Sequence, residues 1–344
     1  MHTLEAIETE ARLDDLLSLP SPQAVQALRA APGDILLLGA GGKMGPTLAR
    51  MARRAADSEE DSRRIIAVSR YSKPSARAAL EQWGVETISC DLLDEAAIQV
   101  LPDAPNVIYM TGMKFGTQGN AAMTWAMNAY LPALVCRRFP GSRIVAFSSG
   151  NVYPLVPVSS GGSIESDALT PLGEYANSVV ARERMFEYFS GEHGTPAAIL
   201  RLNYACELRY GVLVDLAVKV WEEQPVDLTM GYFNILWQGD ANAMGLWALA
   251  QTASPPSVWN MTGPEILSVR AVAEEFGRMF EKQPRLAGEE ASDALLNDAG
   301  RLLDAYGPPR VRAETLIRWI AAWIQQDGAR LNKPTQFTVR DGLY

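Results

Sequence analysis

Histidine and cysteine are scarce in this sequence, and their scarcity limits the chemistry that the chain can perform. The two histidines are His2 and His193, which disfavours a serine–histidine–aspartate triad and a metal site with several histidine ligands. The three cysteines, Cys90, Cys136 and Cys206, are widely separated and lie in or beside apolar segments. This placement is typical of reduced cysteines that pack in a core. We therefore expect no metal site and no disulfide.

Basic residues and long apolar runs are also lacking. Lysine and arginine total 31 against 40 aspartates and glutamates. The resulting formal net charge of -9 works against nonspecific binding to nucleic acid or to a membrane surface. No apolar run approaches the roughly 20 residues that span a bilayer, and the acidic residues 1–8 do not resemble a signal peptide. We expect a cytoplasmic protein without nucleic-acid or membrane partners.

A glycine-rich turn after residue 38 is the most informative segment that is present. Residues 34–38 are typical of a buried strand, and residues 44–55 are typical of a helix. Glycines 39, 42 and 45 suit a tight turn, a close approach of the main chain to phosphates, and close packing of helix on strand. The helix would direct free N–H groups at a pyrophosphate. The residues expected to contact a cofactor here are Gly39, Gly42, Lys43, Met44 and Gly45.

Short apolar runs alternate with helical segments from residue 34 onward, as in a parallel sheet covered on both faces. The sequence thus predicts an α/β protein with a doubly wound parallel sheet, the Rossmann fold, whose ligand crevice lies at the carboxyl ends of the strands. The expected strands are residues 34–39, 64–69, 85–89, 106–111, 142–148 and 197–203, with helices at 45–55, 73–83, 94–100, 120–139 and 173–190.

Three regions follow from this pattern. Residues 1–32 are interpreted as an N-terminal helical extension or a partly ordered tail, and residues 33–203 as the dinucleotide-binding Rossmann domain. Residues 204–344 are interpreted as mainly a smaller C-terminal lobe that binds substrate, with helices near 211–223, 241–252, 268–280 and 314–326. The aromatic residues of this lobe suit either a core or stacking on a sugar ring.

The ends of the second and third strands bear on the choice of cofactor. The second strand ends in Ser69 and Arg70, where an acidic residue would accept hydrogen bonds from the adenosine ribose; these two can instead donate to a 2′-phosphate. We therefore favour NADP and keep NAD as the alternative. After the third strand, Asp91 and Leu92 are expected at the adenine, and Asp94 is expected to cap the next helix.

Several motifs follow one another in order, and together they resemble a known family. After the glycine turn and Asp91-Leu92 come Tyr109-Met110-Thr111-Gly112-Met113-Lys114, Ser148-Ser149-Gly150-Asn151-Val152-Tyr153-Pro154 and Tyr175-Ala176-Asn177-Ser178. Over roughly residues 34–326 the chain resembles an extended short-chain dehydrogenase/reductase of the NAD-dependent epimerase/dehydratase family. The resemblance implies an NAD(P)-dependent oxidoreductase or epimerase that acts on a hydroxyl or keto group of a sugar-like or sugar-nucleotide substrate.

By that resemblance, Ser149 and Tyr175 are the catalytic residues. The serine hydroxyl would orient the reacting oxygen, and the tyrosine phenol would exchange its proton. Further residues are implied at the cofactor or the substrate. They are Thr111, Gly112, Lys114, Tyr175 and Asn203 at the cofactor, and Ser149 and Asn151 at the substrate. Arg209 is expected, by its charge, to contact an anionic substrate, or else to form a surface ion pair. Asn128 resembles a family asparagine near the active site, or it makes a polar contact between helices.

The chain departs from the family at position 179. The family has a lysine four residues after the tyrosine, where its ammonium holds the nicotinamide ribose and lowers the phenol pKa, but this chain has Val179. Three explanations compete. Another cation substitutes, with Lys114 preferred; or Tyr175 acts only as a neutral proton donor; or hydride chemistry is lost. The last makes the protein a noncatalytic dinucleotide-binding sensor or regulator.

The resemblance also implies a homodimer. Family members pair through two helices that match residues 120–139 and 173–190 in this chain.

Overall fold

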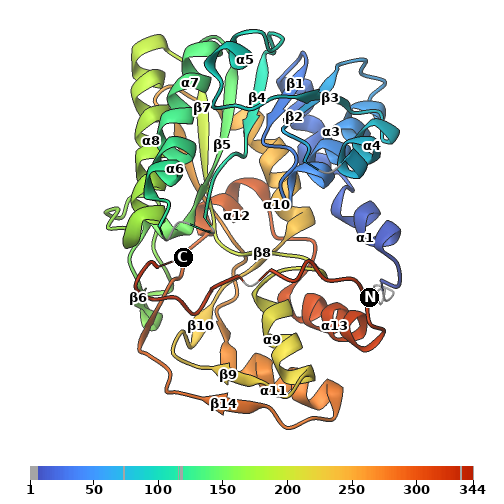
Figure 1. The fold of residues 1–344 in the computed structure, drawn as a ribbon, viewed down its shortest axis with the longest axis vertical. Helices are drawn as coiled ribbons and strands as arrows, with labels where there is room; N and C mark the ends of the chain where they lie inside the picture. The colour runs from blue at the N-terminus through green and yellow to red at the C-terminus, as the bar shows by residue number, and fades with distance from the viewer. Residues whose placement is uncertain (1–6, 73, 115, 117–118, 334, 344) are drawn as a thin grey trace.

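The computed structural model describes residues 7–72, 74–114, 116, 119–333 and 335–343. The chain folds into a larger lobe around a central sheet and a smaller lobe below it (Figure 1). We call them the Rossmann lobe and the second lobe. None of the helices in the described ranges is both long and apolar enough to cross a membrane.

The central sheet has seven parallel strands in the order β12-β7-β5-β4-β1-β2-β3. This doubly wound order confirms the predicted fold class. Its strands are β1 (Ile35–Leu38), β2 (Ile65–Ser69), β3 (Glu86–Ser89), β4 (Asn106–Tyr109), β5 (Arg143–Ser149), β7 (Ala197–Leu202) and β12 (Ser257–Met261).

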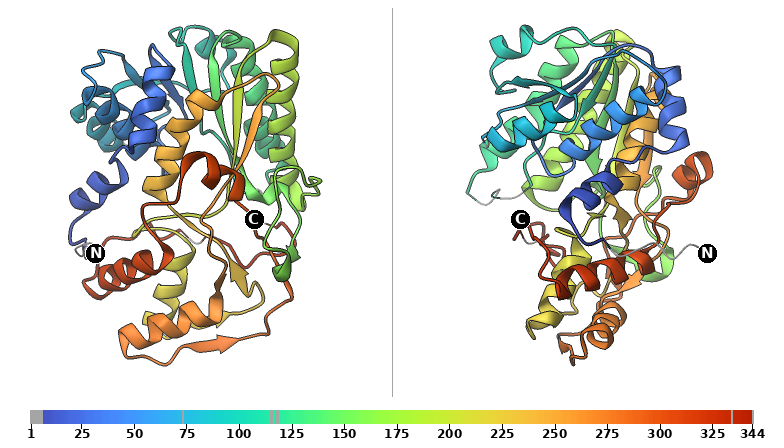
Figure 2. Two further views of the ribbon diagram at one scale, coloured as in Figure 1. Left: turned by 180° about the vertical axis from the view of Figure 1, so that it is seen from behind. Right: turned by 90° about the vertical axis from the view of Figure 1, so that its right-hand side faces the viewer.

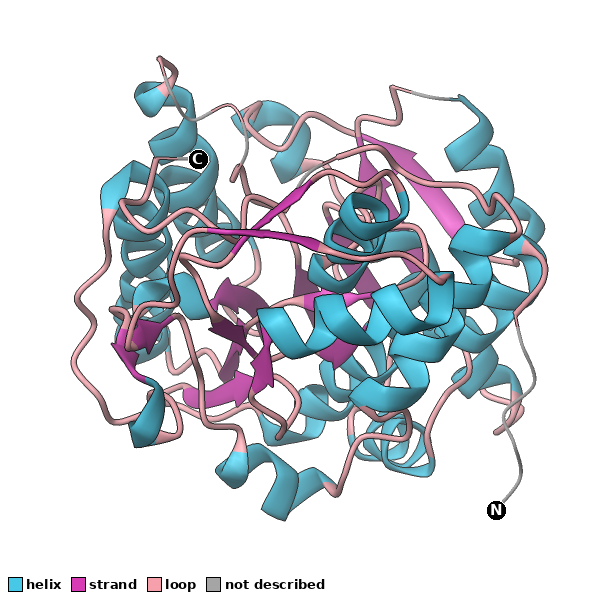
Figure 3. Ribbon diagram, turned by 90° about the horizontal axis from the view of Figure 1, so that it is seen from below, coloured by secondary structure: helices cyan, strands magenta, loops and turns pink. Residues whose placement is uncertain are grey.

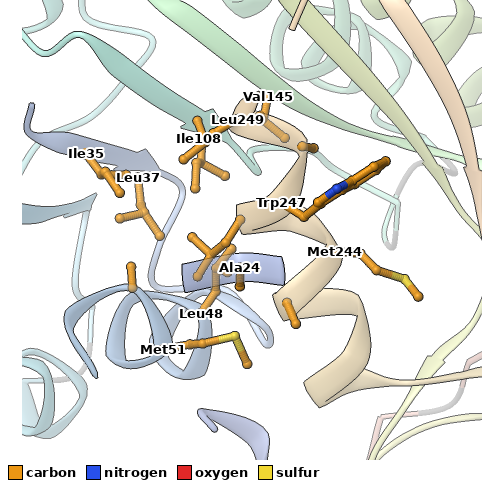
Figure 4. Packing of buried hydrophobic residues seen from close by; sticks show 14 of the residues in the cluster. Ala24, Ile35, Leu37, Leu48, Met51, Ile108, Val145, Met244, Trp247 and Leu249 are labelled. Carbon is orange, nitrogen blue, oxygen red and sulfur yellow. The ribbon is translucent and has the colours of Figure 1, made fainter. Parts of the chain in front are cut away.

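Helices cover both faces of the sheet because successive side chains of a strand point to opposite faces. In β1, Ile35 and Leu37 join a cluster with α2, α3 and α10, part of which Figure 4 shows, whereas Leu36 and Leu38 join a cluster with α5, α7 and α8. The helices of this lobe are α2 (Pro22–Ala30), α3 (Gly45–Asp57), α4 (Pro74–Gln82), α5 (Glu95–Gln99), α6 (Ala121–Trp125), α7 (Leu131–Arg138), α8 (Gly173–His193), α10 (Gln238–Trp247) and α12 (Gly300–Tyr306).

The segment predicted as one helix over residues 120–139 is divided by a π-helix, η1 (Ala126–Tyr130), between α6 and α7. Pro132 explains this, because proline lacks an N–H and its ring crowds the carbonyl of Asn128, four residues earlier. In the widened turn, the N–H of Leu131 bonds to the carbonyl of Ala126, five residues back. The π-helix contains the fully buried Asn128.

The second lobe has its own core, built from helices α9 (Val212–Trp221), α11 (Val269–Phe280) and α13 (Ala313–Gln325). Figure 3 shows the molecule from below, with its helices, strands and connecting loops distinguished by colour. Two-stranded sheets complete the molecule. Their strands are β6 (Val156–Pro157), β8 (Ala205–Cys206), β9 (Pro225–Asp227), β10 (Tyr232–Phe233), β11 (Leu236–Trp237), β13 (Leu267–Ser268), β14 (Arg285–Ala287) and β15 (Asp293–Ala294).

The expected boundary at residue 203 is not the end of the Rossmann lobe. Helix α10 and strand β12 lie in that lobe when the molecule is seen from behind (Figure 2), and β12 pairs with β7 as a seventh strand that the sequence pattern does not reveal. Trp247 and Trp259 pack in the same core as α2 and α3. Part of residues 204–344 therefore belongs to the Rossmann lobe.

The N-terminal helices connect the two lobes. Helix α2 packs in the Rossmann core through Ala24 and Leu28, whereas α1 (Glu10–Leu17) places Leu13 and Leu17 in the core of the second lobe. The described part of residues 1–32 is thus a helical extension with buried contacts to both lobes.

The described residues between 326 and 343 form a C-terminal segment that runs back across the second lobe. The N–H of Leu331 donates to the carbonyl of Arg209, and the Thr335 N–H and hydroxyl both donate to Asp215. Phe337 is buried against Phe233, with ring centroids 6.0 Å apart. The described residues of this segment are therefore fixed by packing as well as by hydrogen bonds.

Candidate functional site

The glycine turn has the geometry that its sequence predicts. Gly39 has a φ of +88°, which L side chains rarely adopt, and a Cβ atom on Gly45 would lie 2.3 Å from the carbonyl oxygen of Ala40. No side chain caps the N-terminus of α3, so its first N–H groups are available to an anion. The turn therefore combines a backbone position that favours glycine with the uncapped N-terminus of a helix.

A cavity of about 300 Å³, here called the central cavity, joins this turn to the predicted catalytic residues. Its walls hold three cationic side chains and no aspartate or glutamate among the described residues. They are formed by Gly39, Gly42, Lys43, Met44, Gly45, Met110, Gly112, Lys114, Phe147, Ser148, Ser149, Asn151, Tyr175, Arg182, Leu202, Asn203, Tyr204, Ala205, Tyr210, Gly211, Val212 and Thr335. Such a lining favours an anionic ligand.

A second cavity of about 450 Å³, the outer cavity, meets the central one at Gly39, Gly42, Met110 and Gly112, which line both. Its walls include the residues predicted at the adenosine, namely Ser69, Arg70, Asp91, Leu92 and Thr111. The two cavities together form one long cleft over the carboxyl ends of β1, β2, β3 and β4.

Polar groups in the outer cavity have distinct local roles. Asp91 accepts a hydrogen bond from the N–H of Leu93, while Asp94 caps α5 through the N–H groups of Ala96 and Ala97. Asp94 is thus the predicted helix cap. The buried hydroxyl oxygen of Thr111 has no hydrogen-bond partner within the described residues. A buried hydroxyl left this way in a cavity wall is a site where a ligand can bond.

Lys43 and Lys114 bring cationic groups into the central cavity from different loops. The Lys43 ammonium donates to the carbonyl of Ala205 at 2.8 Å and lies 4.2 Å from the ring centroid of Tyr210. The Lys114 ammonium lies 5.8 Å from the ring centroid of Tyr175. Burial lowers the pKa of each lysine to about 8, because a low-dielectric environment disfavours the charged form.

Ser149 and Tyr175 line the same cavity from β5 and from the first turn of α8. The Ser149 hydroxyl donates to Asn151 Oδ1 at 3.0 Å and accepts from the N–H of Asn151. The neighbouring Ser148 hydroxyl instead donates to Glu183. Because adjacent strand residues point to opposite sides, Ser149 rather than Ser148 remains the predicted catalytic serine.

Val179 is fully buried in a small apolar cluster with Tyr175, Val152 and Tyr153. The position that carries a lysine in the resembled family is therefore apolar here. For Asn128 the sequence left two alternatives, a place near the active site and a polar contact between helices, and the structure shows both. Its amide donates to Ser178 on α8 and to the carbonyl of Met113 beside the central cavity, and its oxygen accepts from the N–H of Met113.

Arg209, expected at the substrate or in an ion pair, forms ion pairs and does not line the central cavity; a role at the substrate stays a prediction. Its guanidinium pairs with Asp14 at 2.8 Å, Glu207 at 3.1 Å and Glu10 at 3.3 Å. Three carboxylates already compensate its charge, so it ties α1 to the second lobe. It lines instead a third cavity of about 420 Å³ in that lobe, together with Tyr210, Lys219, Arg330 and Lys333.

Several lining residues are absent from the sequence prediction. Tyr210 and Thr335 reach the central cavity from the second lobe and from the C-terminal segment, and Lys333 reaches the outer cavity. No local pattern identifies them, because tertiary packing brings them there. Arg182 is different: it lies seven residues after Tyr175, two turns along one helix, and that spacing is a signal in the sequence.

Comparisons with known proteins agree with this geometry. A model of the family described as NAD dependent epimerase/dehydratase matches residues 35–206, and no curated protein matches the sequence. The fold is similar to that of the UDP-glucose 4-epimerase of Thermotoga maritima with UDP-glucose, at 14% identity and a TM-score of 0.68, covering 86% of this chain and 99% of that one.

Two other solved structures are similar to the same extent. The UDP-glucuronic acid 4-epimerase of Bacillus cereus, in complex with UDP-glucuronic acid and NAD, has 15% identity and a TM-score of 0.69 over 85% of this chain and 99% of that one. DesIV of Streptomyces venezuelae, a dTDP-glucose 4,6-dehydratase with NAD bound, has 15% identity and a TM-score of 0.71 over 86% of this chain and 97% of that one. At these identities the likeness shows the fold.

Proposed function

Because the chain belongs to the NAD-dependent epimerase/dehydratase family, we propose that it is an NAD(P)-dependent oxidoreductase or epimerase that acts on a hydroxyl or keto group of a sugar-like or sugar-nucleotide substrate. The observation that carries this proposal is the long cleft. Its outer cavity suits an adenosine, and its central cavity combines the glycine turn, Ser149 and Tyr175 with three cationic side chains.

The residues of the cleft fit a dinucleotide. The glycine turn and the uncapped helix offer N–H groups to a pyrophosphate, and the unpaired Thr111 hydroxyl offers a hydrogen bond. Among the described residues of the central cavity wall, no carboxylate offers a counter-charge to the cationic side chains, and the phosphates of a dinucleotide would supply it. A bound nicotinamide dinucleotide would supply the hydride acceptor or donor.

The chain's own groups would handle the proton and the substrate oxygen. In this proposal, Tyr175 gives a proton to that oxygen or takes one from it, while the Ser149 hydroxyl donates a hydrogen bond to it. Asn151, which bonds to Ser149, would hold the serine hydroxyl in place. Asn203 and Lys114, both in the cavity wall, would bind the dinucleotide.

Titration of the purified protein with NADH and NADPH tests this function. We expect a saturable change in cofactor or tryptophan fluorescence, followed by turnover in a panel of sugar nucleotides. No saturable change with either dinucleotide would refute the proposal.

We further propose a preference for NADP over NAD. The support is that Ser69 and Arg70 line the outer cavity at the end of β2, where an acidic side chain would repel a 2′-phosphate. NADPH should bind more tightly than NADH, and Arg70→Ala should remove the difference. Arg77→Ala, on α4 with an exposed pair to Glu81, is the matched control. Equal affinities in the wild type would contradict the preference.

A noncatalytic dinucleotide-binding protein is the second candidate function, and the buried Val179 is the observation that favours it. Saturable dinucleotide binding without turnover of any sugar nucleotide would support it. Turnover that Tyr175→Phe abolishes would exclude it.

We also propose a homodimer. Large side chains of Met123, Trp125, Tyr130 and Tyr188 on α6, η1 and α8 are 40% to 58% exposed, and burial of such a patch is expected of an interface. Sedimentation should give twice the chain mass of 37.5 kDa, and Tyr188→Glu should give the monomer. Leu331→Glu, also exposed, should leave the dimer intact. A wild-type monomer at micromolar concentration would refute this proposal.

A cytoplasmic location stays a prediction from the sequence.

A further inference from the structure

Arg182 is a buried cation in the wall of the central cavity, close to the position where the family lysine is missing. It lies on α8, as do Tyr175 and Val179, and is 5% exposed. Side chains on a helix lean toward its N-terminus. The long Arg182 side chain therefore covers the turn that precedes it, on the side of Val179 and Tyr175, and it reaches the cavity wall.

Two hydrogen bonds to neutral oxygens hold the guanidinium, and a glycine leaves room for it. It donates to the carbonyl of Phe147 at 2.9 Å and to Asn128 Oδ1 at 2.7 Å. A Cβ atom on Gly112 would lie 2.4 Å from Arg182 Nη2. Gly112 therefore leaves the space that the guanidinium occupies, directly after β4 and at the junction of the two cavities.

No carboxylate of the described residues forms an ion pair with Arg182, and its Nε has no hydrogen-bond partner there. The adjacent Glu183 pairs with Arg201 instead. An arginine is always charged in a protein, and a buried charge is costly unless it is paired. The fold thus keeps an uncompensated positive charge beside the site, as expected of a group whose counter-charge or polar partner arrives with a ligand.

We propose that Arg182 takes the part of the missing lysine at position 179, and that its guanidinium donates to the ribose–phosphate portion of the dinucleotide next to Tyr175. This inference rests on the proposed function. Residues 179 and 182 are neighbours on the helix surface. In this proposal, Arg182 therefore replaces the missing positive charge from a neighbouring position of the same helix.

Lys114 is the rival cation, since its ammonium also lies near Tyr175. Burial lowers its pKa to about 8, so part of its charge is lost just above neutral pH. The charge of Arg182 persists throughout the physiological range. Arg182 also shares a rigid helix with Tyr175 and is held by two hydrogen bonds, whereas Lys114 lies outside helices and strands.

Dissociation constants for NADH and NADPH, measured by fluorescence titration, test the inference. Arg182→Met should weaken binding about 10- to 100-fold, the effect of one lost charge-assisted hydrogen bond. Arg184→Met is the matched control, because Arg184 lies on the same helix but is about half exposed and paired with Glu187; its affinity should equal that of the wild type. A folded Arg182→Met protein that binds as tightly as the wild type would overturn the inference.

A charge swap separates the role in binding from a role in holding Asn128. The double variant Val179→Lys, Arg182→Met returns a cation to the family position and should recover most of the lost affinity. A folded double variant without recovery would assign Arg182 to structure alone and overturn the inference. If Arg182→Met does not fold, Arg182→Gln keeps one donor for Phe147 while removing the charge, and it should weaken binding similarly; unchanged affinity would overturn the inference.

Three outcomes separate this inference from its rival and from the proposed function. If Lys114→Met weakens binding while Arg182→Met does not, the cation of the site is Lys114 and the inference fails. If the wild type binds neither dinucleotide, the proposed function fails and this inference fails with it. Equal binding by the wild type and Arg182→Met overturns the inference alone.

Discussion

Two tyrosines on α8 allow a matched test of the proposed proton transfer. Tyr175 lines the central cavity, whereas Tyr188 is 58% exposed. In Tyr175→Phe the proton donor is lost but the ring remains, so kcat should fall by about 10²- to 10⁴-fold while the dissociation constant for the dinucleotide stays unchanged. Steady-state kinetics and fluorescence titration give the two quantities.

The matched control for that prediction is Tyr188→Phe, which should keep the wild-type kcat. If Tyr175→Phe also keeps it, Tyr175 does not transfer the proton and the role passes to another group of the cavity.

The lysines of the central cavity predict how affinity depends on pH. Burial lowers the pKa of Lys43 and Lys114 to about 8, so both are mainly charged at neutral pH and mainly neutral well above 8. An anionic dinucleotide binds the charged forms more tightly. Its dissociation constant should therefore increase as the pH rises through about 8, as measured by titration at a series of pH values.

Replacement of Lys43 by arginine should reduce this dependence, because arginine stays charged over the whole range. Adenosine, which has no phosphate, is the control ligand and should bind almost independently of pH. A dinucleotide dissociation constant that stays flat through pH 8 would contradict the assignment of these lysines to the anion site.

At the residue scale, sequence patterns predict only the parts of the cleft that local structure fixes. The turn at Gly39 and Gly45 follows from a buried strand and a helix in direct succession, and both glycines have the predicted constraints. The assigned roles of Ser149 and Tyr175 stay predictions. Arg209 pairs with Asp14, which is remote in sequence, and such a contact leaves no mark in a local pattern.

At the element scale, all six strands predicted between residues 34 and 203 are confirmed. Apolar runs identify the strands buried on both faces, whereas β3, at the edge of the sheet, is exposed at Glu86 and Ser89. Strand β12 is missed: it carries the polar Ser257 and Asn260 beside its apolar residues, and it is held in the sheet by its pairing with β7. The π-helix is missed as well. A proline one turn after Asn128 indicates a disturbed helix, but the resulting shape depends on the packing of Asn128 against Met113 and Ser178.

The C-terminal segment provides a test at this scale. Phe337 is 3% exposed and packs in the core of the second lobe. Phe337→Ala would leave a cavity there and should lower the free energy of unfolding by about 3–5 kcal/mol, measured by urea denaturation. Leu331→Ala, in the same segment but 42% exposed, should change it by less than about 1 kcal/mol. Equal effects would show that the segment does not contribute through its buried ring.

At the scale of the whole molecule, the two lobes share structural elements. Helices α1 and α2 pack in different cores although a short loop joins them, and the ion pair of Arg209 with Asp14 binds α1 to the second lobe. We therefore expect one cooperative thermal transition with equal calorimetric and van't Hoff enthalpies. Two resolved transitions in a calorimetric scan would show that the lobes unfold independently.

The C-terminal segment also bears on whether binding in one cavity affects binding in another. Thr335 lines the central cavity, while Gln336 and Phe337 line the third cavity. Thr335 and Gln336 are covalently joined, so we expect a ligand that orders one cavity wall to affect the other. Occupancy of the two cavities is then thermodynamically linked, and the link must be reciprocal. A ligand bound in the third cavity should change the dissociation constant for the dinucleotide by the same factor by which the dinucleotide changes that for this ligand, and isothermal titration in both orders measures the two factors.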